Sequence, residues 1–546
     1  MVRKIIYSLL AILFSVAELS QLVASPPKLV VNIVVGAMRG GDIDRYKGNF
    51  TKGGFLYLTQ EGMTFTNANY NFQQTITPVS LATLTTGALP STHGVVGECW
   101  WEYILGDRID LIHDNKVTNL AYHLRDYGYS AANLLSPTLT EALLGENPRS
   151  RSVSIALEPS SAIIMSGKVG TPYWIDPLTS AWGTSSAFVA SLPRWVATYN
   201  DSQTIATKTA ERWVARYDQG FYANEHYTKL KPKSKGYESE ALPKARNRAE
   251  QHTITYEQLA YTPIGNSVIF DFAKKAVEAM DLGRDDNPDI VNIYLDPARN
   301  IAQRYGAKSL EVEDMYCYLD HEIEMFIKHI TQSVNSQDLV IVLTSDHGLS
   351  SLTDQNMEPL GYFNSQQFVV LVNSLLKARY GGEDWVLGYD NRNLYLNHKL
   401  IFEHELNISE VQNEVASFAL QFRGVAHAMT ATAMRNGYFG GGYGHKMQNS
   451  FHPRRSGDVV INFMPGWIEQ REGVRADAGS TYRYDSHVPL IICAPAVVTP
   501  RSVASEVTME DVAPTIANIL QIESPAAADG KPIEEIFNTE GLTPQL

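Results

Sequence analysis

Three short segments of the sequence combine the pattern of a buried strand with side chains that bind metals. "LTSDHG" places Asp346 and His347 directly after an apolar run, "IYLDPARN" places Asp296 after another, and "YRYDSHVPLII" places His487 before a third. Carboxylate oxygens and imidazole nitrogens are common ligands of zinc-type ions. Taken alone, each segment is as typical of a residue that is hydrogen-bonded within the fold as of a metal ligand. Together, the three segments predict a metal site.

A hydroxyl group that could act as a nucleophile lies in "TITPVSLATLTTG". Thr77 precedes Pro78, which biases Thr77 away from helix, and the following residues predict a helix whose first amides could face an oxyanion. The residue is therefore either a threonine that caps this helix or a nucleophile beside the metal site.

The elements that must position these side chains are four apolar, β-branched runs, at residues 29–35, 289–295, 338–345 and 488–494, with helical stretches between them. This alternation predicts an α/β fold with a mainly parallel central sheet flanked by helices. Ligands of such sheets bind outside the carboxyl ends of the strands. We therefore expect the site at that edge of the sheet.

The first 24 residues have a basic start, an apolar stretch and small residues near Ala24, which predicts a signal peptide. An uncleaved anchor is less favoured, because Glu18 and Gln21 shorten the apolar run below the ~20 residues of a membrane span. Residues 25–546 then form one α/β domain, with a cap inserted at about 98–258 and a second insertion at about 354–480. We expect a secreted protein of a bacterial periplasm or cell envelope, without a membrane span after signal cleavage.

Charge and cysteine content exclude several classes of function. The formal net charge is −14 and the sequence has no block of Lys and Arg, which argues against nucleic acid as a partner. The three cysteines are an odd number and lie far apart, so they form neither a disulfide framework nor a metal cluster. We expect them to be packed in the fold.

The order of motifs resembles the alkaline phosphatase superfamily over nearly all of the mature chain. Thr77 is followed by "TTGALPSTHGVVG", "LGRDDNPDIVNIYLD", "TSDHG", "NSFHPRRSGDVVINFMPGW" and "YDSHVPLI". The set is most similar to secreted bacterial phosphate-irrepressible alkaline phosphatases with a threonine nucleophile, which are relatives of the nucleotide pyrophosphatase/phosphodiesterases. The resemblance implies two zinc ions about 4 Å apart that stabilise the attacking and leaving oxygens.

The resemblance also implies which residues bind the metals. The positions that this chain retains are the nucleophile Thr77 and the ligands Asp296, Asp346, His347 and His487. Two positions are lost: Gly36 stands where the family has an aspartate, and Asn300 stands where it has a histidine. Glycine offers no ligand and an amide oxygen is a poor one for zinc, so we expect zinc binding to be weak, partial or absent.

The substrate pocket is changed as well. Where the resemblance implies an asparagine, this chain has Glu98. Where it implies a lysine and an arginine, this chain has Glu158 and Ser160. One pair of like charges about 4 Å apart costs about 1 to 4 kcal/mol at surface-like dielectric constants, and here two carboxylates would face a phosphate dianion. We expect ordinary phosphomonoesters to bind poorly.

These observations leave three hypotheses. The first is a catalytically impaired pseudophosphatase with a binding or assembly role and a protein partner in the cell envelope. The second is an active, divergent, metal-dependent phosphomonoesterase or phosphodiesterase that uses Thr77. The third is a structural protein that holds Ca²⁺ or Mg²⁺ through Asp296, Asp346 and His487. The substitutions Gly36→Asp and Asn300→His should restore the metal ligands, unless neighbouring side chains fill the space beside Gly36.

Overall fold

A computed structural model describes residues 25–123, 127–224, 248–354 and 358–537. The predicted signal peptide at residues 1–24 lies outside these ranges. No helix among the described residues is long and apolar enough to cross a membrane. The three cysteines, Cys99, Cys317 and Cys493, are buried free thiols, as expected.

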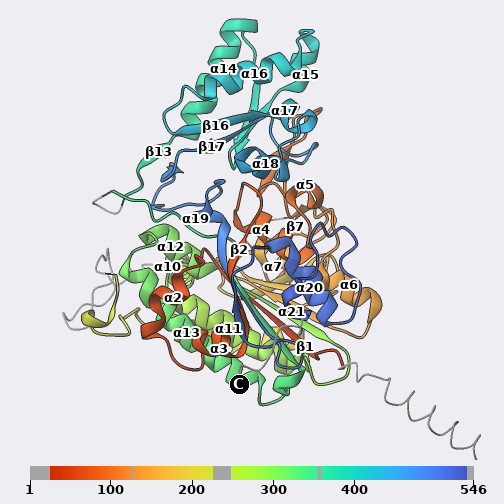
Figure 1. The fold of residues 1–546 in the computed structure, drawn as a ribbon, viewed down its shortest axis with the longest axis vertical. Coiled ribbons are helices and arrows are strands. Elements are labelled where there is room, and N and C mark those ends of the chain that lie inside the picture. The colour runs from red at the N-terminus through yellow and green to blue at the C-terminus, as the bar shows by residue number, and fades with distance from the viewer. Residues whose placement is uncertain (1–24, 124–126, 225–247, 355–357, 538–546) are drawn as a thin grey trace, which may run out of the picture.

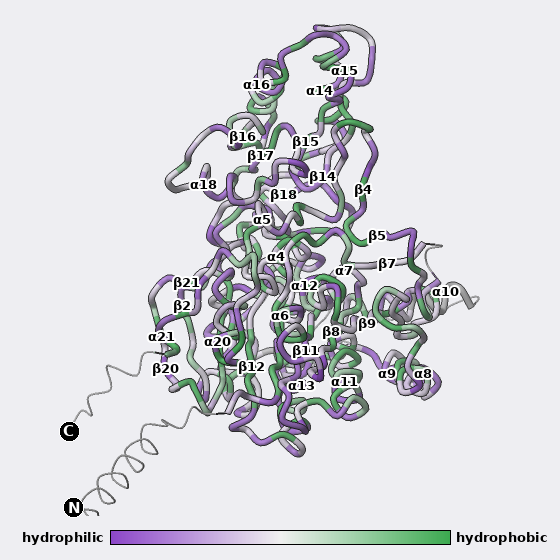
Figure 2. The backbone as a smooth tube through the Cα atoms, turned by 90° about the vertical axis from the view of Figure 1, so that its right-hand side faces the viewer, coloured by the Kyte–Doolittle hydropathy of each residue, from purple (hydrophilic) through white to green (hydrophobic). Residues whose placement is uncertain are grey.

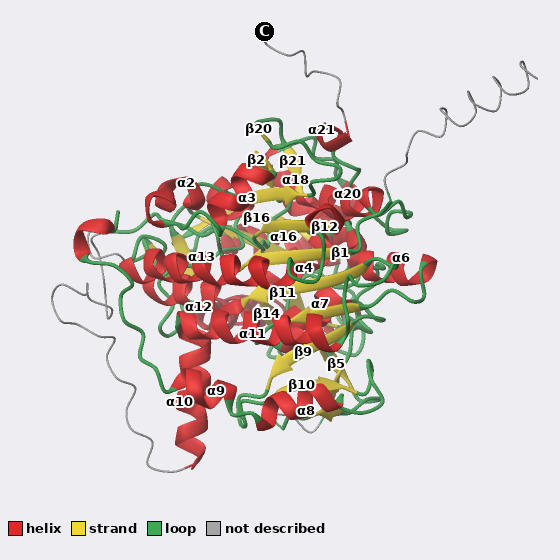
Figure 3. Ribbon diagram, turned by 90° about the horizontal axis from the view of Figure 1, so that it is seen from below, coloured by secondary structure: helices red, strands yellow, loops and turns green. Residues whose placement is uncertain are grey.

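An eleven-stranded sheet forms the centre of the molecule. Its middle strands run parallel to one another in the order β12 (Leu339–Thr344), β1 (Leu29–Val35), β11 (Asp289–Leu295), β8 (Ser152–Ile155) and β9 (Thr171–Ile175). At one side the sheet continues with two strands that pair antiparallel, β19 (His487–Cys493) and β2 (Met63–Asn69). Figure 3 shows these strands in the middle of the molecule with helices around them. The predicted α/β class with a mainly parallel sheet is confirmed.

Helices cover both faces of the sheet because alternate residues of its strands point in opposite directions. In β1, Val31 and Ile33 belong to one hydrophobic core, and Val30 and Val34 belong to the other. The helices on the first face are α11 (Pro263–Ala279), α12 (Asp296–Tyr305) and α13 (Leu310–Ile330), and those on the second are α4 (Thr77–Thr86), α7 (Pro159–Ser166) and α20 (Val512–Ile519). Figure 1 shows the two layers.

A second, smaller lobe lies beyond the end of the main sheet (Figures 1 and 2). It contains an antiparallel sheet in the order β14 (Val386–Asp390), β15 (Asn393–Leu396), β17 (Val459–Phe463) and β16 (Val425–Thr430). Helices α14 (Ser365–Tyr380), α15 (His398–Glu403) and α16 (Ile408–Ala419) contribute to its own hydrophobic core. The lobe falls within the second predicted insertion.

The first predicted insertion differs from the expected cap. Strands β8 and β9, which lie inside residues 98–258, pair with β11 and with each other in the central sheet. The polar and aromatic residues around them hide the strand pattern, because β8 reads "SVSI" and β9 reads "TPYWI". This part of the chain therefore builds the sheet instead of covering it.

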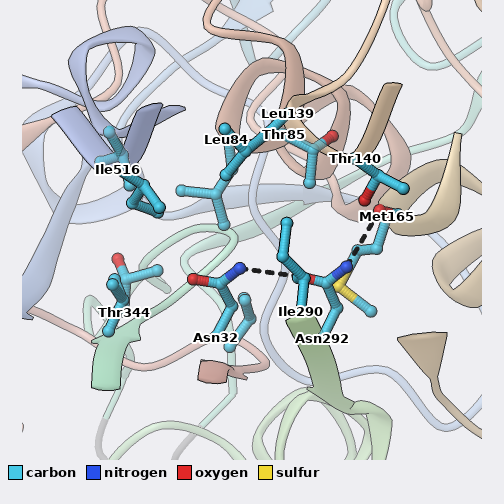
Figure 4. Close-up of a pocket in the computed structure, with 13 residues that line it drawn as sticks. Asn32, Leu84, Thr85, Leu139, Thr140, Met165, Ile290, Asn292, Thr344 and Ile516 are labelled. Carbon is cyan, nitrogen blue, oxygen red and sulfur yellow. Dashed lines mark hydrogen bonds between the residues drawn. The ribbon is translucent and has the colours of Figure 1, made fainter. Parts of the chain in front are cut away.

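A buried polar contact links β1 and β11 (Figure 4). Asn32 Nδ2 donates to Asn292 Oδ1 at 2.7 Å, and Asn292 Nδ2 donates to Ser154 Oγ at 3.0 Å. Asn32 Oδ1 has no protein partner and lines an internal cavity of about 20 Å³. This volume suits one water molecule and no larger ligand.

Candidate active site

A cleft of about 370 Å³ lies where the main sheet meets the smaller lobe. Thr77, Glu98, Arg299, Gln303 and His347 line it from the main lobe. The smaller lobe and the segment before β19 contribute a second set of lining residues: Tyr389, Asp390, Arg392, Glu469, Arg471, Asp477 and Ala478. It lies at the carboxyl edge of the sheet, where the strand pattern predicted a site.

Thr77 is the first residue of α4 and is almost fully buried. Thr77 Oγ1 donates a hydrogen bond to Asp346 Oδ2 at 2.7 Å, and the Tyr294 hydroxyl donates to the same oxygen at 2.7 Å. The backbone amides of Ala37 and His347 donate to Asp346 Oδ1, each at 2.9 Å. Both oxygens of Asp346 are therefore engaged, and the carboxylate fixes the position of the Thr77 hydroxyl.

His347 lies beside this pair at the end of β12. Its Nδ1 is 2.6 Å from the Gly348 carbonyl oxygen, and its Nε2 is 3.3 Å from Asp346 Oδ2. A carbonyl oxygen only accepts, so Nδ1 carries a proton and donates it to Gly348. The predicted grouping of Thr77, Asp346 and His347 is thus present in the structure.

Arg299 is a site residue that sequence reasoning missed. Its Nη1 donates to Thr77 Oγ1 at 2.9 Å, and its Nη2 forms an ion pair with Glu158 Oε1 at 2.6 Å. Burial opposes the charge of the guanidinium, but Glu158, Tyr294 and Asp296 together raise the pKa of Arg299 well above its usual value. A fixed positive charge therefore lies directly at the Thr77 hydroxyl.

Gly36 makes room for this arginine. A Cβ atom added at residue 36 would lie 2.7 Å from the Arg299 Cβ, 2.9 Å from the Leu295 carbonyl oxygen and 3.0 Å from the Arg299 nitrogen. Of the two outcomes expected for Gly36→Asp, this packing favours the one in which a neighbouring side chain fills the space, because an aspartate at this position requires α12 to move. The space beside Gly36 is filled by Arg299.

Asp296 and Asn300 make contacts within the protein. Asp296 Oδ2 accepts a hydrogen bond from the Leu157 amide at 2.6 Å, while burial and the charge of Glu158 raise the pKa of Asp296 well above its usual value. Asn300 Oδ1 accepts hydrogen bonds from Arg299 Nε at 3.2 Å and Nη2 at 3.0 Å. Asn300 thus orients the guanidinium.

His487 is turned away from these residues. Its Nε2 is 3.0 Å from the Thr66 carbonyl oxygen, and its ring packs so closely on Gly40 that a Cβ there would lie 2.3 Å from it. Asp477 and Ala478 of this segment do line the cleft, but Asp477 is paired with Arg471 and the Ala478 methyl group cannot bind a metal. The predicted metal role of His487 stays a prediction that no contact supports.

The donor set does not fit the two-zinc centre that the resemblance implies. Within the described ranges, no three His, Cys, Asp or Glu side chains are grouped so that they could hold a metal ion. Gly36 supplies no donor atom, Asn300 Oδ1 already accepts from Arg299, and the positive charge of Arg299 repels a cation. The retained Asp346 and His347 are two ligands where a catalytic zinc site normally has three from the protein.

Carboxylates also lie in and around the cleft. Ser160 Oγ donates to Glu98 Oε1 at 3.2 Å, and the pKa of Glu98 is raised to about 7 by desolvation within the cleft and by the charge of Glu158. Desolvation also raises the pKa of Asp390 to about 6. The structure therefore brings together Glu98, Glu158 and Ser160, as the sequence predicted.

Comparisons with known proteins agree with this architecture. The family model "Type I phosphodiesterase / nucleotide pyrophosphatase" matches residues 30–480. A relative named "Calcium-transporting ATPase" from Myroides odoratus is 28% identical over 535 residues, which cover 96% of this chain and 97% of that protein. "Alkaline phosphatase PafA" from Elizabethkingia meningoseptica is 26% identical over 522 residues, which cover 94% of each chain.

The same fold is found in a crystal structure of wild-type alkaline phosphatase PafA. It superposes with a TM-score of 0.86 at 24% sequence identity, and the match covers 94% of this chain and 100% of that one. At this identity the likeness shows the fold alone.

Proposed function

Because this chain belongs to the type I phosphodiesterase / nucleotide pyrophosphatase family, we propose that it is a pseudophosphatase, which keeps the family's cleft for binding but not its two-metal hydrolysis. The observation that carries this proposal is the position of Arg299, which is bound to Thr77 and Glu158 and packed against Gly36. A guanidinium at this point competes with a metal ion for the same hydroxyl. Binding or assembly then becomes the role of the cleft.

The contacts of Thr77 support the loss of hydrolysis. In the family, zinc lowers the pKa of a bound oxygen and so generates a nucleophile. Here Thr77 donates to Asp346, whose two oxygens already accept from Tyr294 and from backbone amides. Both carboxylate oxygens are thus occupied as acceptors, so Asp346 fixes the position of the Thr77 hydroxyl.

The charge of the cleft indicates the kind of ligand. Glu98, Asp390 and Glu469 line it. Of its three arginines, Arg299 is paired with Glu158 and Arg471 with Asp477, while Arg392 donates to the Ala478 carbonyl oxygen. A dianionic phosphate ester would meet this carboxylate wall. The cleft therefore suits a polar ligand of neutral or positive charge, and its volume is that of a small-molecule site.

The proposed function also includes a cellular location and a partner for the protein. The basic and apolar pattern of residues 1–24 supports export, after which the mature protein would work in the periplasm or cell envelope with a protein partner.

An active, divergent phosphoesterase is the second candidate. The hydrogen bond of 2.7 Å from Thr77 to Asp346 and the relative named alkaline phosphatase favour it. The relatives' names thus support hydrolysis, whereas the side chains around Thr77 support its loss. No observation favours the third hypothesis of a Ca²⁺ or Mg²⁺ site, since Asp296, Asp346 and His487 contact different elements.

Hydrolysis assays separate the two candidates. The purified mature protein is tested with 4-nitrophenyl phosphate and bis(4-nitrophenyl) phosphate, with and without added zinc, beside the variants Thr77→Ala and Thr85→Ala. Thr85 is a matched control because it lies on the same helix and bonds only to α4 carbonyl groups in the described structure. We expect negligible turnover in all three proteins. Zinc-dependent turnover that Thr77→Ala abolishes and Thr85→Ala retains would establish the phosphoesterase instead.

A further inference from the structure

A second cavity, of about 390 Å³, lies in the smaller lobe. It opens between α15, α16 and α17 (Ala431–Asn436) and the loop that follows β3 (Cys99–Trp101), from which Tyr103 reaches it. None of its lining residues lines the cleft around Thr77. It is therefore a separate space whose use does not depend on hydrolysis.

The polar side of this cavity is a completed hydrogen-bond network. Asp458 is fully buried, and its Oδ1 accepts from His398 Nε2 at 2.7 Å and from Gln412 Nε2 at 2.8 Å. The Leu396 amide donates to Asp458 Oδ2 at 2.8 Å. These bonds occupy both oxygens of the carboxylate as acceptors. The network gives the cavity a rigid wall.

The other side is aromatic and aliphatic. Tyr103 stacks on His398, with ring centroids 4.4 Å apart and planes 16° apart. Ile401, Leu406 and Ile408 line the cavity, and so does Phe402, although 83% of its surface is exposed. An exposed phenylalanine at the rim of an apolar hollow is typical of a surface that a ligand covers.

One lining cation gives this hollow its charge preference. Arg435 is exposed and donates from Nη2 to the Pro453 carbonyl oxygen at 3.2 Å. It forms no ion pair with any described residue, whereas Asp458, the lining carboxylate, is engaged by His398 and Gln412. The remaining guanidinium donors are thus available to an anion.

We propose that this cavity binds an amphipathic organic anion, with a hydrocarbon chain or ring against Ile401, Phe402 and Leu406 and a carboxylate or sulfonate at Arg435. The apolar wall accounts for the hydrocarbon part and the unbalanced guanidinium for the anionic part. The neutral alcohol of the same chain length should bind less tightly, because it lacks the ionic contact.

Isothermal titration of the mature protein with dodecanoate tests the proposal, with dodecanol as the neutral probe. The variants are Arg435→Gln and Phe402→Ser, and the controls are Arg454→Gln and Leu420→Ser, which change an exposed arginine and an exposed leucine of the same lobe. All four positions are exposed, so the fold should be retained. Circular dichroism checks this.

We expect saturable binding of dodecanoate that Arg435→Gln weakens about tenfold, the effect of losing one charge-assisted contact. The same variant should leave dodecanol binding nearly unchanged, whereas Phe402→Ser should weaken both probes. The controls should bind as the wild type does. Absence of saturable dodecanoate binding would overturn the proposal, and so would equal affinities of the wild type and the Arg435 and Phe402 variants.

Discussion

Arg299 packs so closely against Gly36 that a methyl group on the glycine would lie 2.7 Å from the arginine Cβ. Gly36 follows the last residue of β1, and Arg299 lies in the first turn of α12, three residues after Asp296. This contact explains both the glycine at residue 36 and the position of the Arg299 guanidinium. The same close approach leaves no room for a side chain at residue 36 and brings a guanidinium to Thr77.

The variant Gly36→Ala should therefore lower the free energy of unfolding by about 1–3 kcal/mol, the usual cost of overpacking a buried site. Urea denaturation measures the change. Gly41→Ala is the control, since a Cβ at Gly41 meets no atom within 4 Å. Equal stability of the two variants would show that β1 and α12 are not tightly packed at this point.

The ion pair between Arg299 and Glu158 should contribute about 1–2 kcal/mol to stability. The side chains are 12% and 31% exposed, so solvent screens the pair only in part. A double-mutant cycle with Arg299→Met and Glu158→Gln measures this coupling energy. The exposed pair Lys399–Glu403, with side chains 71% and 54% exposed, serves as a reference and should give only a few tenths of a kcal/mol. Additive effects of the two site substitutions would disprove the coupling.

Glu98 should make stability depend on pH. Its pKa of about 7 in the folded protein lies above the usual glutamate value of about 4.3, so the folded state binds the proton more tightly than the unfolded state. The stabilisation is complete below about pH 4 and is lost as the pH rises through about 7.

The stability of Glu98→Gln relative to the wild type should therefore be higher at pH 8 than at pH 5. Denaturation at both pH values measures this gain, and Glu472→Gln, at a position that does not line the cleft, is the control. If the difference between Glu98→Gln and the wild type is the same at both pH values, Glu98 does not titrate as stated.

The sequence predicted the parts of the site that lie next to strand ends. Asp346 and His347 follow β12, and Thr77 begins α4, so the strand pattern and the proline were sufficient to place them. The contact between Glu98 and Ser160 followed from the family resemblance, which covers both segments.

The missed residues depend on how elements pack. Arg299 follows Asp296 by three residues on a helix, a spacing that puts both side chains on one face, and this signal was present in the sequence. Its contact with Thr77 depends on the approach of α12 to Gly36, which no local pattern reveals. Ala478 and the orientation of His487 likewise depend on the path of the loop before β19.

Zinc content tests the central claim, that Arg299 and the missing ligands replace the two-metal centre. The mature protein is purified, dialysed against metal-free buffer and analysed by inductively coupled plasma mass spectrometry, with alkaline phosphatase PafA treated in parallel. The absence of good zinc ligands at Gly36 and Asn300 and the charge of Arg299 predict well under two zinc ions per chain. Two tightly held zinc ions per chain would contradict this account.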